Sequence, residues 1–110
     1  MAQLPQPFRR FTRDNPAVAE AYDTLGRACG EAGPLDAKTR ELVKLGMAVG
    51  ARLEGAVHSH ARRALEAGAT PGEIRHVVTL AAPTLGFPTT VAAQTWIEDV
   101  LPRQRGTRGR

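Results

Sequence analysis

The chain has 110 residues, a length that suits one domain, and only five aromatic side chains, so its core is expected to be aliphatic and rich in alanine. Its 15 basic and 11 acidic residues give a net charge of +4, but four arginines lie in residues 103–110 and the rest of the chain is balanced, which argues against a nucleic-acid-binding surface on the domain. The single cysteine, Cys29, excludes an intramolecular disulfide, and no run approaches the roughly 20 apolar residues that span a bilayer, so we expect a cytoplasmic protein without a membrane partner.

Residues 1–14 are predicted to form an extended N-terminal arm. They contain Pro5, Pro7 and a small group of arginines. Phe8 and Phe11 are the apolar side chains through which this arm is expected to pack.

The sequence predicts a first helix that begins at Pro16. Asn15 is a good capping residue, and proline suits the first position of a helix. Glycines in residues 30–33 are expected to end the helix. Because Cys29 extends the apolar stripe of this helix, we expect a buried small side chain rather than a reactive thiol.

A second helix is predicted to follow Pro34, with Asp36 as its cap and its end near residue 52. It is apolar around much of its circumference, at Leu42, Val43, Leu45, Met47, Ala48 and Val49. Such a helix should lie at the centre of the domain or at a subunit interface. We therefore expect the protein to assemble with itself, as a trimer or a hexamer.

The third predicted helix begins near residues 54–56 and ends at Gly68, a natural left-handed cap. His58 and His60 lie on opposite margins of its apolar stripe. At about 100° per residue the two imidazoles diverge by roughly 160°. They cannot clamp one metal ion from a regular helix, so no metal site is predicted.

Two further helices complete the predicted fold. Thr70 and Glu73 form a capping-box pattern at the start of the fourth, and Pro83 ends or kinks it. The fifth follows a break around Gly86, and Pro102 stops it. No segment alternates as a strand does, so we predict an all-α, single-domain bundle of five to six helices over residues 15–102, followed by a disordered basic tail, 103–110.

Three stretches carry a family resemblance: LDAKTRELVKLGMAVG, SHARRALEAGATPGEIRHVV and LAAPTLGFPTTVAAQ. They cover 51 of the 110 residues and resemble the carboxymuconolactone decarboxylase family, which includes the alkyl hydroperoxide reductase D-type proteins. The resemblance implies an all-helical domain whose paired central helices form trimers or hexamers.

Redox members of that family carry a Cys-x-x-Cys pair four residues before a histidine, and a glutamate twelve residues before the first cysteine. On this chain the histidine falls on His60 and the glutamate on Glu41, whereas the cysteine positions fall on Leu53 and Ala56. Peroxide reduction requires a thiolate and a resolving thiol. The resemblance therefore implies a member without thiol peroxidase activity.

The decarboxylase branch also lacks the cysteine pair and keeps a histidine after a serine, as in Ser59-His60. This resemblance implies a cofactor-independent lyase or isomerase of small carboxylated molecules. His60 would move the proton and Glu41 would orient the imidazole. Candidate substrate-binding residues are Arg52, Arg62, Arg63 and Phe87.

Other interpretations stay open at the level of sequence. Glu41 is spaced from Lys38 and Lys44 as in an ordinary surface ion pair on a helix. His60 has the position of an imidazole satisfied by a backbone carbonyl or by a neighbouring subunit. The alternatives are a non-catalytic helical oligomer that binds a small molecule or protein, or a relative of the peroxidases that has lost its redox cysteines. Nucleic-acid binding through the basic tail is not expected.

Overall fold

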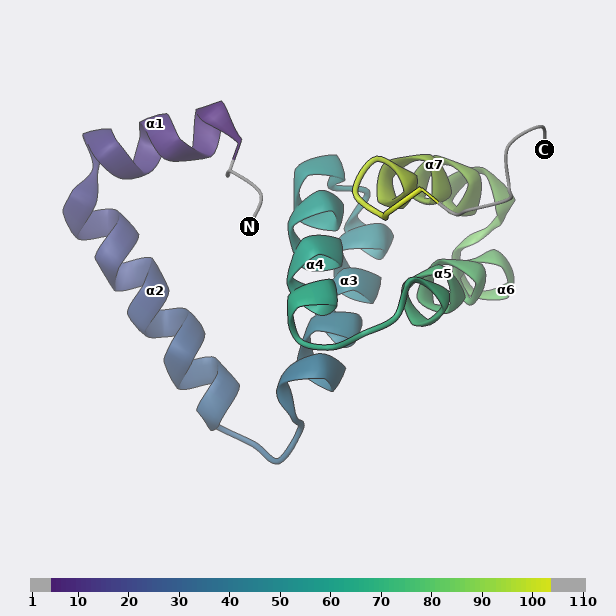
Figure 1. Ribbon diagram of the computed structural model, residues 1–110, viewed down its shortest axis with the longest axis horizontal. Coiled ribbons are helices and arrows are strands. Elements are labelled where there is room, and N and C mark those ends of the chain that lie inside the picture. Colours follow the sequence, from purple (N-terminus) through teal and green to yellow (C-terminus); the bar gives the residue numbers. More distant parts are fainter. Residues whose placement is uncertain (1–4, 104–110) are drawn as a thin grey trace. The chain divides into compact units, whose positions relative to one another are not determined.

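The computed structural model describes residues 5–103, and these residues form seven α-helices and no β-strand (Figure 1). The helices are α1 (Gln6–Asp14), α2 (Pro16–Glu31), α3 (Ala37–Ala51), α4 (Glu54–Glu66), α5 (Pro71–Thr79), α6 (Ala81–Leu85) and α7 (Phe87–Glu98). The all-α class is confirmed. The five to six helices predicted for residues 15–102 agree with the six found there, α2 to α7, although the short α6 was not expected as a separate helix. The predicted tail lies outside the described residues except for its first position.

Contacts within the chain divide it into two units, residues 1–35 and residues 36–110. The first unit contains α1 and α2, and the second contains α3 to α7. Every residue proposed from the sequence as part of a site belongs to the second unit. Among residues 5–103, no helix is long and apolar enough to cross a membrane.

The predicted extended arm is wrong over Gln6–Asp14, which is helical. The first turn of a helix leaves its N–H groups unpaired, so Pro5 at the cap and Pro7 in the first turn begin a helix rather than prevent one. Asn15 separates α1 from α2, and its backbone N–H donates to the carbonyl of Phe11 at 2.9 Å. No residue of α1 is buried, and Phe8 and Phe11 are 41% and 52% exposed.

Helix α2 begins at Pro16, as predicted, but buries none of its residues. Val18, Tyr22 and Leu25 are each more than half exposed, and Cys29 is exposed as well. The prediction of a buried cysteine is therefore wrong. The apolar stripe exists, but the first unit holds a single other helix, which cannot enclose it.

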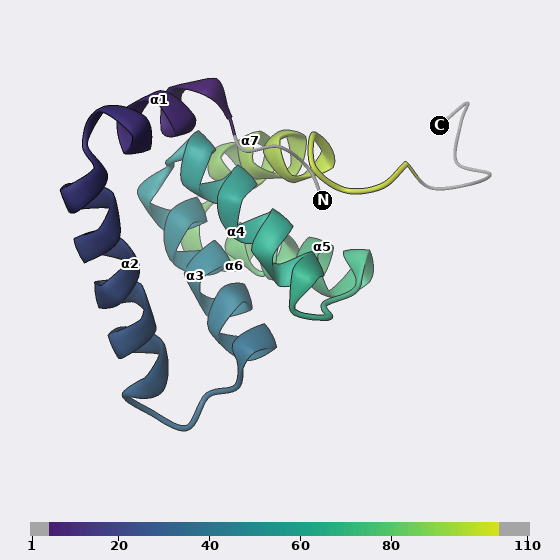
Figure 2. The ribbon, with the colours of Figure 1, turned by 60° about the vertical axis from the view of Figure 1, so that its left-hand side comes forward.

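Helices α3 and α4 lie side by side and run antiparallel in the second unit (Figure 1, Figure 2). Asp36 caps α3, as predicted: its Oδ1 accepts from the backbone N–H of Thr39 at 2.9 Å, and this hydrogen bond is the largest cause that lowers the pKa of Asp36. Arg52 follows α3 in the left-handed conformation, with φ 57°. This residue reverses the chain within two positions, which sets α4 back along α3.

The hydrophobic core lies among the helices of the second unit. Its buried members are Leu45, Ala48, Val49, Val57, Ala61, Ala64, Ala69, Ile74, Val78, Ala81, Ala93, Ile97 and Leu101. Residues of α4, α5 and α7 supply most of it. Helix α3 buries one face only, and its Val43 and Met47 are exposed.

Two prolines set the ends of α5 and α7 from four residues away. In an α-helix each carbonyl accepts a hydrogen bond from the backbone N–H of the residue four positions later, and proline has no such N–H. Helix α5 ends at Thr79, four residues before Pro83, and α7 ends at Glu98, four residues before Pro102. The breaks were predicted at the prolines themselves, so the helices end earlier than expected and Pro83 lies inside α6.

Candidate functional site

Glu41 of α3 and His60 of α4 face each other across the antiparallel helix pair. The Nδ1 atom of His60 lies 2.8 Å from Oε1 of Glu41. Only 21% of the histidine side chain and 16% of the glutamate side chain are exposed. The two groups that the sequence singled out are thus brought together in a partly buried position.

The hydrogen bond determines which ring nitrogen of His60 is available for chemistry. A carboxylate only accepts, so the bond requires a hydrogen on Nδ1. In the neutral imidazole this leaves Nε2 as the basic atom. Nε2 has no hydrogen-bond partner among the described residues. Lys44 adds a positive charge near the pair, with its Nζ 3.9 Å from Oε2 of Glu41.

The four candidate substrate-binding residues are placed differently. Arg52 donates to Oγ1 of Thr89 at 2.6 Å, which joins the end of α3 to the first turn of α7. Phe87 begins α7 and is 70% exposed. Arg63 follows His60 by three residues and shares its side of α4, whereas Arg62 lies roughly 160° around the helix. Of the two arginines on α4, Arg63 is therefore the better placed to reach an anion at His60.

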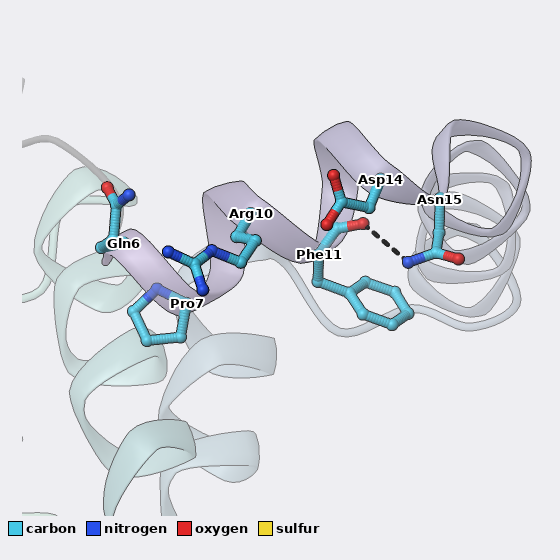
Figure 3. Close-up of a pocket in the computed structure, with 6 residues that line it drawn as sticks. All are labelled: Gln6, Pro7, Arg10, Phe11, Asp14 and Asn15. Atoms are coloured by element: carbon cyan, nitrogen blue, oxygen red, sulfur yellow. Dashed lines mark hydrogen bonds between the residues drawn. The ribbon is translucent and has the colours of Figure 1, made fainter.

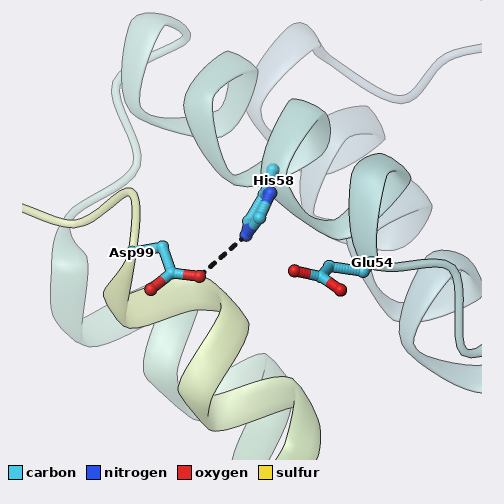
Figure 4. Close-up of side chains that lie close together, drawn as sticks. All are labelled: Glu54, His58 and Asp99. Atoms are coloured by element: carbon cyan, nitrogen blue, oxygen red, sulfur yellow. Dashed lines mark hydrogen bonds and ion pairs between the residues drawn. The ribbon is translucent and has the colours of Figure 1, made fainter. Parts of the chain in front are cut away.

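His58 points to another side of α4, as predicted, and pairs with Asp99, which lies just after α7. Its Nε2 lies 3.0 Å from Oδ2 of Asp99. The carboxylate of Glu54 lies near both groups (Figure 4). The spacing of Glu54 and His58, four residues apart on one helix, was a readable signal. Asp99 could not be identified from sequence spacing, because it is 41 residues from His58.

A hollow of about 400 Å³ lies along α1 in the first unit (Figure 3). It is lined by Gln6, Pro7, Arg10, Phe11, Asp14 and Asn15. Its lining comes from α1 and the residue that follows it, and it shares no residue with the Glu41–His60 pair.

The model of a protein family described as the carboxymuconolactone decarboxylase family matches residues 16–99, which include the Glu41–His60 pair. The chain belongs to this family. An uncharacterised protein of Haemophilus influenzae is 38% identical over 63 residues, or 57% of this chain. The matched region spans 56% of the length of that protein.

A solved structure supports the same assignment at the level of the fold. The apo crystal structure of a carboxymuconolactone decarboxylase family protein from Legionella pneumophila has a TM-score of 0.70 to this chain and 25% sequence identity. The likeness covers 84% of this chain and 82% of the Legionella chain.

Leu53 and Ala56 stand at the start of α4, where redox members of the carboxymuconolactone decarboxylase family are expected to carry their cysteines. Leu53 is the residue that precedes the helix, and Ala56 lies in its first turn. A helix N-terminus lowers the pKa of a thiol, so this position suits a thiolate. Here both side chains are apolar, and Cys29 lies in the first unit.

Proposed function

We propose that this chain is a cofactor-independent lyase or isomerase of small carboxylated molecules, with His60 as the proton-transfer group and Glu41 as its orienting partner. The proposal rests on one observation, the 2.8 Å hydrogen bond between the two side chains in a partly buried position. An acid that holds one ring nitrogen leaves the other to act on a substrate. Glu41 would also stabilise the imidazolium that forms during the transfer.

The reaction needs two operations on the substrate. In a decarboxylation, the bond between the carboxyl carbon and its neighbour breaks, CO₂ leaves, and the electron pair passes into a conjugated enolate. The imidazolium of His60 then returns a proton to a carbon of that system. In an isomerisation, Nε2 removes a proton from one carbon and returns it to another. Either route requires a cation beside the remaining carboxylate or enolate oxygen, and Arg63 is the nearest candidate along α4.

The proposal is tested with a panel of small γ-lactone carboxylates, carboxymuconolactone among them. CO₂ release reports decarboxylation, and deuterium uptake from D₂O into substrate or product, followed by NMR, reports proton transfer. We expect His60→Ala to lose roughly a hundredfold or more of any turnover found, the usual contribution of a general acid or base. His76→Ala is the matched control because His76 is an exposed imidazole on α5.

Unchanged turnover in His60→Ala would contradict the proposal, as would the absence of turnover and of proton exchange across the panel. The wild-type chain is also expected to reduce no hydroperoxide with a dithiol as reductant. Dithiol-dependent peroxide reduction that survives Cys29→Ser would overturn the expectation that redox chemistry is lost.

A further inference from the structure

We propose that Glu54, His58 and Asp99 form a binding site for one divalent transition-metal ion, which links the first turn of α4 to the end of α7. The site shares no side chain with the Glu41–His60 pair. It therefore stands independently of the function proposed for that pair.

Three potential ligand atoms converge on one point between the two helices. The nearest carboxylate oxygens of Glu54 and Asp99 and a ring nitrogen of His58 all lie within 4.8 Å of one another. Figure 4 shows the imidazole directed at Asp99, with the carboxylate of Glu54 directed towards the same space. Glu54 and His58 are four residues apart on α4, so one face of the helix presents both.

The donor set selects a class of metal ion. One imidazole nitrogen and two carboxylate oxygens suit zinc and its neighbours in the first transition series better than magnesium or calcium, which prefer oxygen alone. Two ligand atoms that bind the same zinc ion at about 2.0–2.2 Å lie roughly 3–3.5 Å from each other. His58 and Asp99 are already 3.0 Å apart. Closing the site requires a movement of the Glu54 carboxylate, whose side chain is exposed.

The position of Asp99 gives an independent electrostatic reason for a cation. Asp99 is the C-terminal cap residue of α7, where the helix dipole presents negative charge and disfavours another anion. A carboxylate oxygen of Glu54 lies within 4.8 Å of the ligand atoms of His58 and Asp99 and adds a second negative charge. One imidazole carries at most a single positive charge, so a divalent ion compensates the two carboxylates better than His58 does.

The test is isothermal titration of zinc chloride into the full chain, freed of chelator and carrying no polyhistidine tag. We expect one zinc ion per chain and a higher melting temperature with zinc, since the ion binds the folded state. His58→Ala, Asp99→Asn and Glu54→Gln should each weaken binding by at least about tenfold, the loss that even an outer-shell partner causes. There are two matched controls. His76→Ala removes an exposed imidazole, and Glu66→Gln changes an exposed glutamate on α4; both should bind zinc as the wild type does.

Zinc binding that is unchanged in His58→Ala, or lost equally in His76→Ala, would overturn the site. Unchanged binding in Glu54→Gln would overturn the three-ligand arrangement. X-ray absorption at the zinc edge of the wild-type chain needs no variant: one imidazole among oxygen donors is expected, and two imidazoles or none would contradict the proposal. His60→Ala should bind zinc normally, so a failure of this site and a failure of the proposed function are distinguishable.

Discussion

At the scale of the residue, a proton-transfer role of His60 depends on the negative charge of Glu41. Glu41→Gln keeps the shape of the side chain and can still accept from Nδ1, but it removes the charge that stabilises an imidazolium. We expect kcat to fall with little change in KM, because the loss arises in the transition state. Steady-state kinetics measure the split, with Glu66→Gln on the exposed side of α4 as control. A rise in KM at constant kcat would assign Glu41 to substrate binding instead.

Ile97 tests the core at the same scale. Its side chain is fully buried on α7. Ile97→Ala leaves a cavity and should lower the free energy of unfolding by about 2–5 kcal/mol. Urea denaturation followed by circular dichroism measures the change. Gln94→Ala, at an exposed position of the same helix, should change stability by no more than about 0.5 kcal/mol.

Single residues also mark what the sequence could and could not predict. Asp36 and Thr70 were correctly identified as caps because a cap bonds to residues three positions on, within the same stretch of sequence. The Glu41–His60 contact was found through family resemblance rather than through spacing. Asp99 was missed because its partner His58 belongs to a different helix, and only the packing of α4 against α7 brings them together.

At the scale of the element, α5 depends on its capping box. The Thr70 hydroxyl accepts from the backbone N–H of Glu73 at 3.0 Å, and the Glu73 carboxylate accepts from the backbone N–H of Thr70 at 3.0 Å. Thr70→Ala should destabilise the chain by about 1 kcal/mol, whereas Thr70→Ser should keep most of the stability. Urea midpoints measure both, with Thr79→Ala at the other end of α5 as control. Equal stability of the alanine and serine variants would contradict a capping role.

The ion pair between α5 and the end of α7 predicts a pH dependence. Two nitrogens of Arg75 donate to the two carboxylate oxygens of Glu98, at 2.7 and 3.1 Å. The hydrogen bonds from Arg75 hold the pKa of Glu98 below its ordinary value of 4.5. As the pH falls through that value, the unfolded chain takes up the proton before the folded chain does. The stabilisation is therefore complete above about pH 4.5 and is lost as the pH falls through the folded-state pKa.

Glu98→Gln is expected to flatten the fall in unfolding free energy between about pH 5 and pH 3. Both side chains are partly exposed, so the loss at neutral pH should stay within about 1 kcal/mol. Urea titrations across the pH range measure the slope. The pKa of Glu73 is also lowered, first by the backbone N–H of Thr70 and then by Lys38, so part of the slope should persist in this variant. A slope equal to that of the wild type would exclude Glu98 as a contributor.

Helix ends show why element boundaries were predicted only approximately. The prolines were correctly identified as breaks, but a missing N–H acts on the carbonyl four residues earlier, so α5 and α7 end before the proline rather than at it. Helix α1 was not predicted for the opposite reason: its prolines do not interrupt the helix. Its prolines lie at the cap and in the first turn, where the missing N–H costs nothing.

At the scale of the whole molecule, many large apolar side chains are exposed. This is the main feature of the core that was not predicted from the sequence. In the second unit, large apolar side chains more than about two-fifths exposed are Val43, Met47, Leu53, Leu80, Leu85, Phe87 and Val91. Periodicity correctly found apolar faces but could not tell which of them another helix of the same chain covers. For α3, which is apolar on most sides, the chain covers one face and leaves another open.

Self-association would cover such a face, and we expect the chain to form a trimer or a hexamer. An exposed apolar surface this extensive on a small unit is typical of an interaction surface. Light scattering at micromolar concentration should then give three or six times the chain mass of 11.8 kDa.

Met47, 68% exposed in the middle of α3, is the most direct test. Met47→Glu buries a charge in any interface at α3 and should shift the mass towards that of one chain, because an unpaired charge is costly to desolvate. Gln94→Glu on α7 adds the same charge at a polar position and should leave the mass unchanged. A wild-type chain that scatters as a monomer would contradict the assembly, and an assembled Met47→Glu variant would place its interface away from this face of α3.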